Sequence, residues 1–328
     1  MLIRASAPGK LVLCGEYAVL DGANSIAMAV NRRAFVDIRQ GADGASTVSS
    51  PGLFDSPVEF TVAEGQVVAI ANESRDLGLL ASVLPNFSSP PADYVLDSRA
   101  LYDKSGEKLG LGSSAALCVA LCGALSGKAG SASTLSEAIA LHRAFQQSRG
   151  SGIDVATAMS GGVIQYSISP EPTVYKVDWP ESLLYRVFWS GKSASTTEKL
   201  KRLAASGESA ERDELFAASN ECAASWVNGD AGQVLRTTAG FTESLRVFSA
   251  RAGLDVFAAG HGRMHEQAKA MDVVYKPCGA GGGDIGIAMA TGFEQLDAFS
   301  SVVAEAGFAP IDLVLESDGL IVSSDEQA

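Results

Sequence analysis

The sequence predicts a globular protein that mixes helices and strands, in two parts that meet near residues 180–190. Its 328 residues are enough for two ordinary hydrophobic cores. The first half alternates strand and helix patterns, whereas residues 208–271 are rich in Glu, Arg and Ala and are typical of helices. The 47% hydrophobic and 19% charged composition is that of a soluble, folded chain. We expect one domain over residues 1–185 and a second over 186–328.

The first half is expected to begin with strands. Residues 2–14 and 25–38 have strand patterns and are joined by a turn at Asp21-Gly22. Residues 41–57 are rich in Gly, Ser and Pro, which predicts loops with short strands. A further strand is expected from Tyr94 to Leu101. Strands therefore come before helices in this half.

Helices are expected next, over residues 113–127 and 134–148. Strands at 163–168 and 184–190 lead into the helical stretch at 208–271. Two more helical stretches and short strands close the chain, and Asp318-Gly319 predicts a final hairpin turn.

The charge of the chain limits its partners. It carries 25 Lys and Arg against 38 Asp and Glu, a net charge of −13, which argues against nucleic acid or an acidic membrane surface as a partner. An anionic substrate would have to be captured by a few local cations or helix N-termini. No apolar run approaches the roughly 20 residues of a membrane span. The five cysteines are odd in number and lack a CxxC pair, which predicts a reduced, cytoplasmic protein. The oligomeric state is not indicated.

The most informative stretch is Gly110-Leu111-Gly112-Ser113-Ser114-Ala115-Ala116, which opens the helix expected at 113–127. A glycine-rich turn before a helix exposes backbone N–H groups at the positive end of the helix dipole, and such groups bind phosphate. The serine hydroxyls can cap the helix, or they can hold a phosphate oxygen or Mg²⁺. Because Gly-Ser turns also cap many helices, this stretch alone leaves an ordinary cap open.

Three further motifs point to the same chemistry. Lys10 follows a Pro-Gly turn in the first strand, and alone it would be an ordinary surface lysine. Asp154 follows Gly150-Ser151-Gly152-Ile153 at a helix start, where an acidic residue can simply favour the helix dipole. Residues 279–284, Gly-Ala-Gly-Gly-Gly-Asp, predict a second anion-binding loop, for which a flexible linker is the alternative.

Two other features are expected to be structural. His261 and His265 lie four residues apart on an expected helix, a spacing that suits a metal, but no third ligand is near them in the sequence. A surface helix is the simpler interpretation. Asp213-Glu214 is expected to lie on a solvated helix face.

The order and spacing of the Lys10, Gly110 and Gly279 motifs resemble those of the GHMP small-molecule kinases. Within that superfamily, three strings look most like those of the phosphomevalonate kinases: Lys108-Leu109-Gly110-Leu111-Gly112-Ser113-Ser114-Ala115, Gly150-Ser151-Gly152-Ile153-Asp154-Val155 and Gly279-Ala280-Gly281-Gly282-Gly283-Asp284. The resemblance implies a two-domain α+β fold with ATP and substrate in the cleft between the domains. It also implies transfer of a phosphoryl group from MgATP to (R)-5-phosphomevalonate, giving the 5-diphosphate.

The resemblance assigns roles to particular residues. Lys10 and Asp154 would be catalytic, and Ser114 would bind Mg²⁺. The ATP phosphates would be bound by Lys108, Gly110, Leu111, Gly112, Ser113, Ser114 and Ala115. Phosphomevalonate, the expected small-molecule partner, would be bound by Lys10, Ser151, Gly152, Asp154, Ser193, Ser195, Gly281, Gly282 and Asp284, with Lys192 a further candidate.

The sequence departs from the family pattern at two points. Gln147-Ser148-Arg149 stands where a Gly-Lys pair is common, which leaves two alternatives: Arg149 supplies that charge, or the charge is missing. Mevalonate kinases carry a Mg²⁺-binding Glu in this region, whereas Gln146-Gln147-Ser148 offers none, and the second metal ligand is left unassigned. Two alternatives stay open: another acceptor such as mevalonate or a sugar, and a sensor that binds ligand without catalysis.

Overall fold

The computed structural model describes most of the chain. The described residues are 1–41, 45–53, 56–70, 77–87, 90–127, 132–147, 150–194 and 196–325. Within these ranges, no helix combines the length and the apolar character that crossing a membrane requires.

The first sheet is built on two long antiparallel strands, β1 (Leu2–Cys14) and β2 (Ser25–Gln40), as the strand patterns predict. The 3-10 helix η1 (Ala18–Asp21) connects them. Residues 25–30 of β2 are all buried, which explains their continuous apolar run, whereas burial alternates further along the strand, where one face is open. The strand order is β13-β1-β2-β6-β3-β4-β5, and β7 pairs with the first part of β2 and with β8. The bounds of the other strands are β3 (Ser46–Ser49), β4 (Val58–Ala63), β5 (Gln66–Ala69), β6 (Ala92–Asp97), β7 (Val163–Ser167), β8 (Thr173–Val177) and β13 (Ile321–Asp325).

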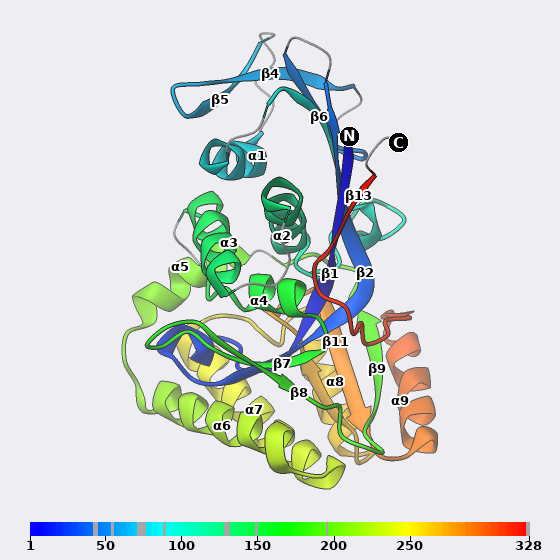
Figure 1. Cartoon of the computed structure of the whole chain (residues 1–328). Helices are drawn as coiled ribbons and strands as arrows, with labels where there is room; N and C mark the ends of the chain where they lie inside the picture. Colours follow the sequence, from blue (N-terminus) through cyan, green and yellow to red (C-terminus); the bar gives the residue numbers. More distant parts are fainter. Residues whose placement is uncertain are drawn as a thin grey trace.

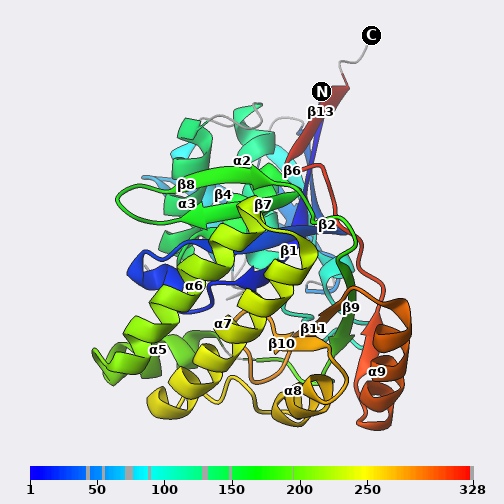
Figure 2. The ribbon, with the colours of Figure 1, turned by 90° about the horizontal axis from the view of Figure 1, so that it is seen from below.

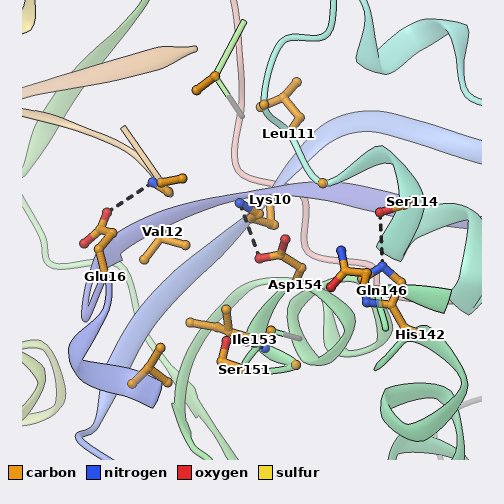
Figure 3. A pocket seen from close by; sticks show the side chains of 18 of the residues that line it. Lys10, Val12, Glu16, Leu111, Ser114, His142, Gln146, Ser151, Ile153 and Asp154 are labelled. Atoms are coloured by element: carbon orange, nitrogen blue, oxygen red, sulfur yellow. Dashed lines mark hydrogen bonds and ion pairs between the residues drawn. The ribbon is translucent and has the colours of Figure 1, made fainter. Parts of the chain in front are cut away.

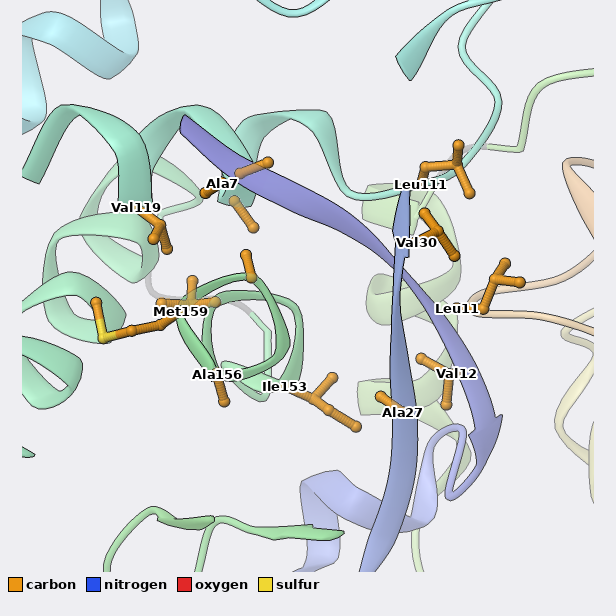
Figure 4. Packing of buried hydrophobic residues seen from close by; sticks show 14 of the residues in the cluster. Ala7, Leu11, Val12, Ala27, Val30, Leu111, Val119, Ile153, Ala156 and Met159 are labelled. Carbon is orange, nitrogen blue, oxygen red and sulfur yellow. The ribbon is translucent and has the colours of Figure 1, made fainter. Parts of the chain in front are cut away.

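Helices α1 to α4 lie on one side of β1 (Figure 1). α2 (Ser113–Ser126) is buried around its whole circumference from Ala115 to Ala124, in agreement with its uninterrupted apolar sequence. Figure 4 shows Val119 of α2 and Met159 of α4 near Ala7 of β1. This core fixes where α2 and α4 begin. The other helices here are α1 (Gly78–Val83), α3 (Ala132–Phe145) and α4 (Ile153–Ser160), with 3-10 turns η2 (Leu84–Asn86) and η3 (Arg99–Leu101).

The second sheet is antiparallel, with the order β10-β11-β9-β12. Its strands are β9 (Leu184–Trp189), β10 (Val274–Pro277), β11 (Ile285–Ala290) and β12 (Ala309–Ile311). α8 and α9 pack on it around Phe188, Tyr275 and Phe299, while α6 and α7 lie side by side (Figure 2). The helices are α5 (Thr196–Ser206), α6 (Ala210–Asn228), α7 (Ala231–Ala252), α8 (His261–Lys269) and α9 (Phe293–Glu305). Asp213 and Glu214 are exposed, as expected.

The end of the chain differs from expectation, because the hairpin predicted at Asp318-Gly319 is wrong. β12 pairs with β9 of the second sheet, whereas β13 pairs with β1 of the first. The segment between them is held to the first sheet, since the Arg33 guanidinium donates to the Asp318 and Gly319 carbonyls. The last strand therefore returns to the first sheet. The boundary between residues 185 and 186 stays a prediction.

The strand expected from Tyr94 to Leu101 is also shifted. β6 begins at Ala92 and ends at Asp97, and the 3-10 turn η3 follows it. The Asp97 carboxylate accepts from the Arg99 backbone N–H at 3.0 Å, which turns the chain out of the sheet.

Candidate active site

A cavity of about 600 Å³ opens where the two sheets and the helix starts meet. Among the described residues, its walls come from five parts of the chain: β1 with the turn after it, residues 108–114, the end of α3 with the start of α4, Ala194 with Lys199 of α5, and residues 279–284. Figure 3 shows Lys10, Ser114 and Asp154 around it. Residues as far apart in the sequence as Lys10 and Asp284 thus line one site.

The first glycine loop, residues 110–115, leads into α2 with its backbone amides available. Gly110 and Gly112 have φ angles of +77° and +76°, which favour glycine. Gly112 is the N-cap of α2, and no side chain among the described residues caps the helix, so within that part of the chain the first N–H groups lack the usual side-chain partner. A Cβ on Gly110 would lie 2.6 Å from the Asp284 side chain. The two glycine-rich segments are therefore packed against each other.

Lys10 lies at the centre of the cavity wall. Its side chain is 8% exposed, and its Nζ lies 3.3 Å from Oδ1 of Asp154, whose side chain is 34% exposed. The Lys10 backbone N–H donates to the Leu111 carbonyl at 2.9 Å, which ties β1 to the first glycine loop. Asp154 lies in the first turn of α4, after the left-handed Gly152. A buried ammonium thus faces the amides at the start of α2.

Ser114 contacts a residue that the sequence did not point to. Its Oγ lies 3.0 Å from Nε2 of His142, which comes from α3 and is buried. Burial lowers the pKa of His142, and the charge of Asp154 acts in the opposite direction. A single histidine on a helix gives no motif, so the sequence alone held no signal for this contact. Within the described residues, no group of three or more His, Cys, Asp or Glu could hold a metal ion.

The second glycine loop, residues 279–284, has left-handed φ angles at Gly279, Gly281, Gly282 and Asp284. Gly279, Ala280 and Asp284 line the cavity. Gly281 and Gly282 pack instead against the 255–256 segment, where the Gly282 N–H donates to the Val256 carbonyl at 2.6 Å. Burial raises the pKa of Asp284, and its carboxylate accepts from the Ala194 N–H at 3.0 Å. The loop therefore has a cavity face and a structural face.

The predicted serines differ in their position relative to the cavity. Ser151 lines the cavity, and its Oγ accepts from the Ile153 N–H at 3.3 Å. Ser193 is exposed outside the cavity lining, and its hydroxyl bonds to Glu107 and to the Lys108 carbonyl. Ser195 and Arg149 lie outside the described residues.

The lysines next to these segments also differ in placement. Lys108, just before the first glycine loop, lines the cavity although its side chain is exposed. Lys192 is exposed and lies outside the cavity lining.

Glu16, Tyr17 and Lys199 line the cavity but were not predicted. Glu16 and Tyr17 follow the Lys10 motif directly, so their position beside it was the available signal. The Tyr17 hydroxyl donates to the Ala280 carbonyl at 2.7 Å, and the Lys199 ammonium donates to the Gly281 carbonyl at 2.7 Å. Both side chains thus hold the second glycine loop.

His261 and His265 do not lie on a surface helix face, and that expectation is wrong. Both are buried under the second sheet. His261 bonds through Nδ1 to the Tyr275 hydroxyl at 2.8 Å and through Nε2 to the Gly283 carbonyl at 3.0 Å. Burial lowers the pKa of His261 to about 4, which keeps the ring neutral. These bonds give the histidine a structural role.

A glycine-rich helix start beside a buried lysine is an arrangement that suits small-molecule kinases. Residues 79–162 match the model of the GHMP kinases N terminal domain. This stretch of the chain is thus similar to the N-terminal domain of the GHMP kinases, which are phosphotransferases that use ATP, typically with Mg²⁺. The match spans the first glycine loop and Asp154, two of the motifs that the sequence singled out.

The chain is also similar to individual kinases that are named for mevalonate or phosphomevalonate. The phosphomevalonate kinase of Streptomyces sp. (strain CL190) is 28% identical over 86% of this chain and 88% of its own. The mevalonate kinase of Aeropyrum pernix is 33% identical over 52% of each chain. Among solved structures, a Lin0012 protein from Listeria innocua has a TM-score of 0.85 at 21% identity, covering 99% of this chain and all of that one. Streptococcus pneumoniae phosphomevalonate kinase in complex with phosphomevalonate and AMPPNP has a TM-score of 0.76 at 17% identity, covering 95% and 99%. These two structures support the α+β fold.

Proposed function

We propose that the chain transfers the γ-phosphoryl group of ATP to the phosphate of (R)-5-phosphomevalonate, forming the 5-diphosphate. The observation that carries this proposal is the placement of Lys10. Its buried ammonium lies between the free amides of α2, the Asp154 carboxylate and the second glycine loop. A reaction between two polyanions requires such a cation at the point of transfer. The similarity to a phosphomevalonate kinase over 86% of the chain supports the choice of acceptor.

The first glycine loop is the proposed binding site for the nucleotide phosphates. Its amides lie at the positive end of the α2 dipole, and Lys108 adds a cation at the rim of the cavity. Ser114 fits a magnesium site, because its hydroxyl oxygen lies at the cavity wall and oxygen is the ligand that Mg²⁺ prefers. Magnesium, when bound there, supplies positive charge that offsets the charge of the phosphates.

Lys10 would neutralise the charge on the group being transferred. Its surroundings support this, since the cavity wall shields the ammonium from water and strengthens its electrostatic effect. Asp154 would hold the ammonium in place through the 3.3 Å ion pair.

The protonation state of the acceptor decides whether Asp154 has to act as a base. A phosphate monoester has a second pKa of about 6 and is largely a dianion at pH 7, so no proton has to be removed from it. An alcohol must lose a proton, and an aspartate base is then useful. On the proposed acceptor, Asp154 orients Lys10 and the substrate rather than acting as a base.

Mevalonate is the second candidate acceptor. The observation in its favour is that Asp154 lines the cavity beside Lys10 with its side chain one third exposed, where it could accept a hydroxyl proton. The similarity to the Aeropyrum pernix mevalonate kinase, over half of the chain, points the same way.

An acceptor panel tests the proposal. Purified protein with MgATP would be offered phosphomevalonate, mevalonate, galactose and homoserine, and ADP release would be followed in a coupled assay. We expect the highest kcat/KM with phosphomevalonate. ATP binding without turnover on any acceptor would instead indicate a ligand sensor.

A further inference from the structure

A second buried lysine, Lys276 at the end of β10, contacts the turn that follows β1. Lys276 is fully buried and Glu16 is 4% exposed. The Lys276 ammonium bonds to Oε1 of Glu16 and donates to the Val12 carbonyl at 3.2 Å. The two residues are 260 positions apart, so this pair joins the second sheet to the first.

The pair also holds one wall of the cavity. Oε1 of Glu16 accepts from the backbone N–H of Gly279, the first residue of the second glycine loop, at 3.3 Å. Val12 lies at an irregularity of β1, where the pairing with β2 shifts, and two residues beyond Lys10. A Cβ on Gly279 would lie 3.7 Å from the Lys10 Nζ, so the loop and Lys10 are neighbours. Lys276 and Glu16 thus connect the loop to the strand that carries Lys10.

A contribution to stability is a poor explanation for the presence of this buried ion pair. The other carboxylate oxygen of Glu16, Oε2, is buried and has no hydrogen-bond partner among the described residues. Burial is the largest single influence and lowers the pKa of Lys276, but the charge of Glu16, the hydrogen bond to it and the interactions with Cys278 and Cys14 together outweigh burial and raise the pKa, so the ammonium stays charged. A well-packed apolar pair of similar volume is often as stable as a buried ion pair, or more so.

We propose that Lys276 and Glu16 are a positioning pair, which sets the second glycine loop at its distance from Lys10 across the two sheets. The pair does not reach the reacting atoms and acts through Gly279 and Val12. This inference rests on the proposed function, because the wall that the pair fixes belongs to the proposed transfer site.

A double variant separates positioning from stability. Lys276→Met alone leaves a buried carboxylate unpaired and is expected to lower Tm and kcat together. Lys276→Met with Glu16→Gln removes both charges and keeps the volumes. We expect this double variant to recover at least half of the lost Tm while its kcat stays at least 10-fold below wild type. The KM for ATP should change less than threefold. If Lys276→Met does not fold, the double variant alone carries the test.

Hydrogen exchange gives a readout that does not depend on the acceptor. We expect the backbone amides of residues 278–284 to exchange at least 10-fold faster in the double variant. Lys269→Met, at an exposed lysine of α8, is the matched control and should leave exchange, kcat and Tm unchanged.

Three results would overturn the positioning role: a double variant with kcat within twofold of wild type, a loss confined to KM, or unchanged exchange over residues 278–284. Absence of phosphomevalonate turnover in the wild-type protein would overturn the proposed function instead. The exchange measurement would then still decide the role of the pair.

Discussion

Lys10 and Lys276 are both buried and both paired with a carboxylate, but they are held in different ways. Lys276 is fully enclosed with Glu16 and also bonds to the Val12 carbonyl. Lys10 pairs at 3.3 Å with an aspartate that is one third exposed, at the wall of the 600 Å³ cavity. An ammonium has three N–H donors, and the Asp154 pair uses one of them. The surroundings, rather than the charge, thus distinguish the lysine that we expect to contact a ligand from the lysine that we propose to position the cavity wall.

Replacing the cavity lysine should have the largest effect on turnover. For Lys10→Met we expect kcat to fall by about 10³–10⁴-fold, which corresponds to about 4–5.5 kcal/mol, because the transferred charge loses its cation. Steady-state kinetics with MgATP and phosphomevalonate measure this. A kcat near that of the wild type would remove Lys10 from the mechanism.

For stability the order is reversed, and replacing Lys276 should cost more than replacing Lys10. Lys276→Met is expected to reduce the free energy of unfolding by about 3–5 kcal/mol, because it leaves Glu16 buried and unpaired. For Lys10→Met the loss should stay below about 1 kcal/mol, since Asp154 can be solvated from the cavity. Urea denaturation of both variants makes the comparison, and equal losses would contradict the distinction.

The free energy of unfolding should also depend on pH, through His261, which is buried under the second sheet. The pKa of His261 is lowered to about 4 by burial, whereas an unfolded histidine titrates near 6.5. Below pH 6.5 the unfolded chain binds a proton that the folded chain does not, so stability falls as the pH drops from about 6.5 to about 4. Between pH 7.5 and 5 we expect this histidine to contribute a loss of about 2 kcal/mol.

The variant His261→Gln isolates that contribution. The pH dependence of its urea denaturation should be weaker than that of the wild type by about the same 2 kcal/mol. Identical pH dependence in the two proteins would show that His261 is not buried in its neutral form.

Asp154→Asn should give the smallest effect. With phosphomevalonate we expect kcat to fall by about 10-fold, or about 1.4 kcal/mol, because the asparagine still contacts Lys10 and no proton has to be removed. A loss of 10³-fold or more would show that Asp154 acts as a base, which fits an alcohol acceptor better. In that case the carboxylate partners of the two lysines would also differ, because Asp154 would act as a base and Glu16 would not.

The parts of the site that the sequence predicted are those whose chemistry is local. Gly110 and Gly112 require left-handed backbone, and Asp154 follows a glycine at a helix start, so short strings of residues indicate them. Long helices such as α2 and α7 were also found, since their patterns are continuous.

The parts that were missed depend on tertiary contacts. Glu16 meets Lys276 across 260 residues, and Ser114 meets His142 from a separate helix. Asp318-Gly319 has a hairpin sequence, but strand pairing with β1 overrides it. His261 lies under the second sheet because Tyr275 and Gly283 bind it from other elements. None of these contacts leaves a spacing pattern in the sequence.

One competition experiment tests the central claim most directly. Wild-type protein with limiting MgATP would be given equal concentrations of phosphomevalonate and mevalonate, and both products would be quantified by mass spectrometry, so that their ratio reports the ratio of kcat/KM. The account predicts at least a 100-fold excess of the 5-diphosphate. Formation of 5-phosphomevalonate from mevalonate at an equal or greater rate would contradict it.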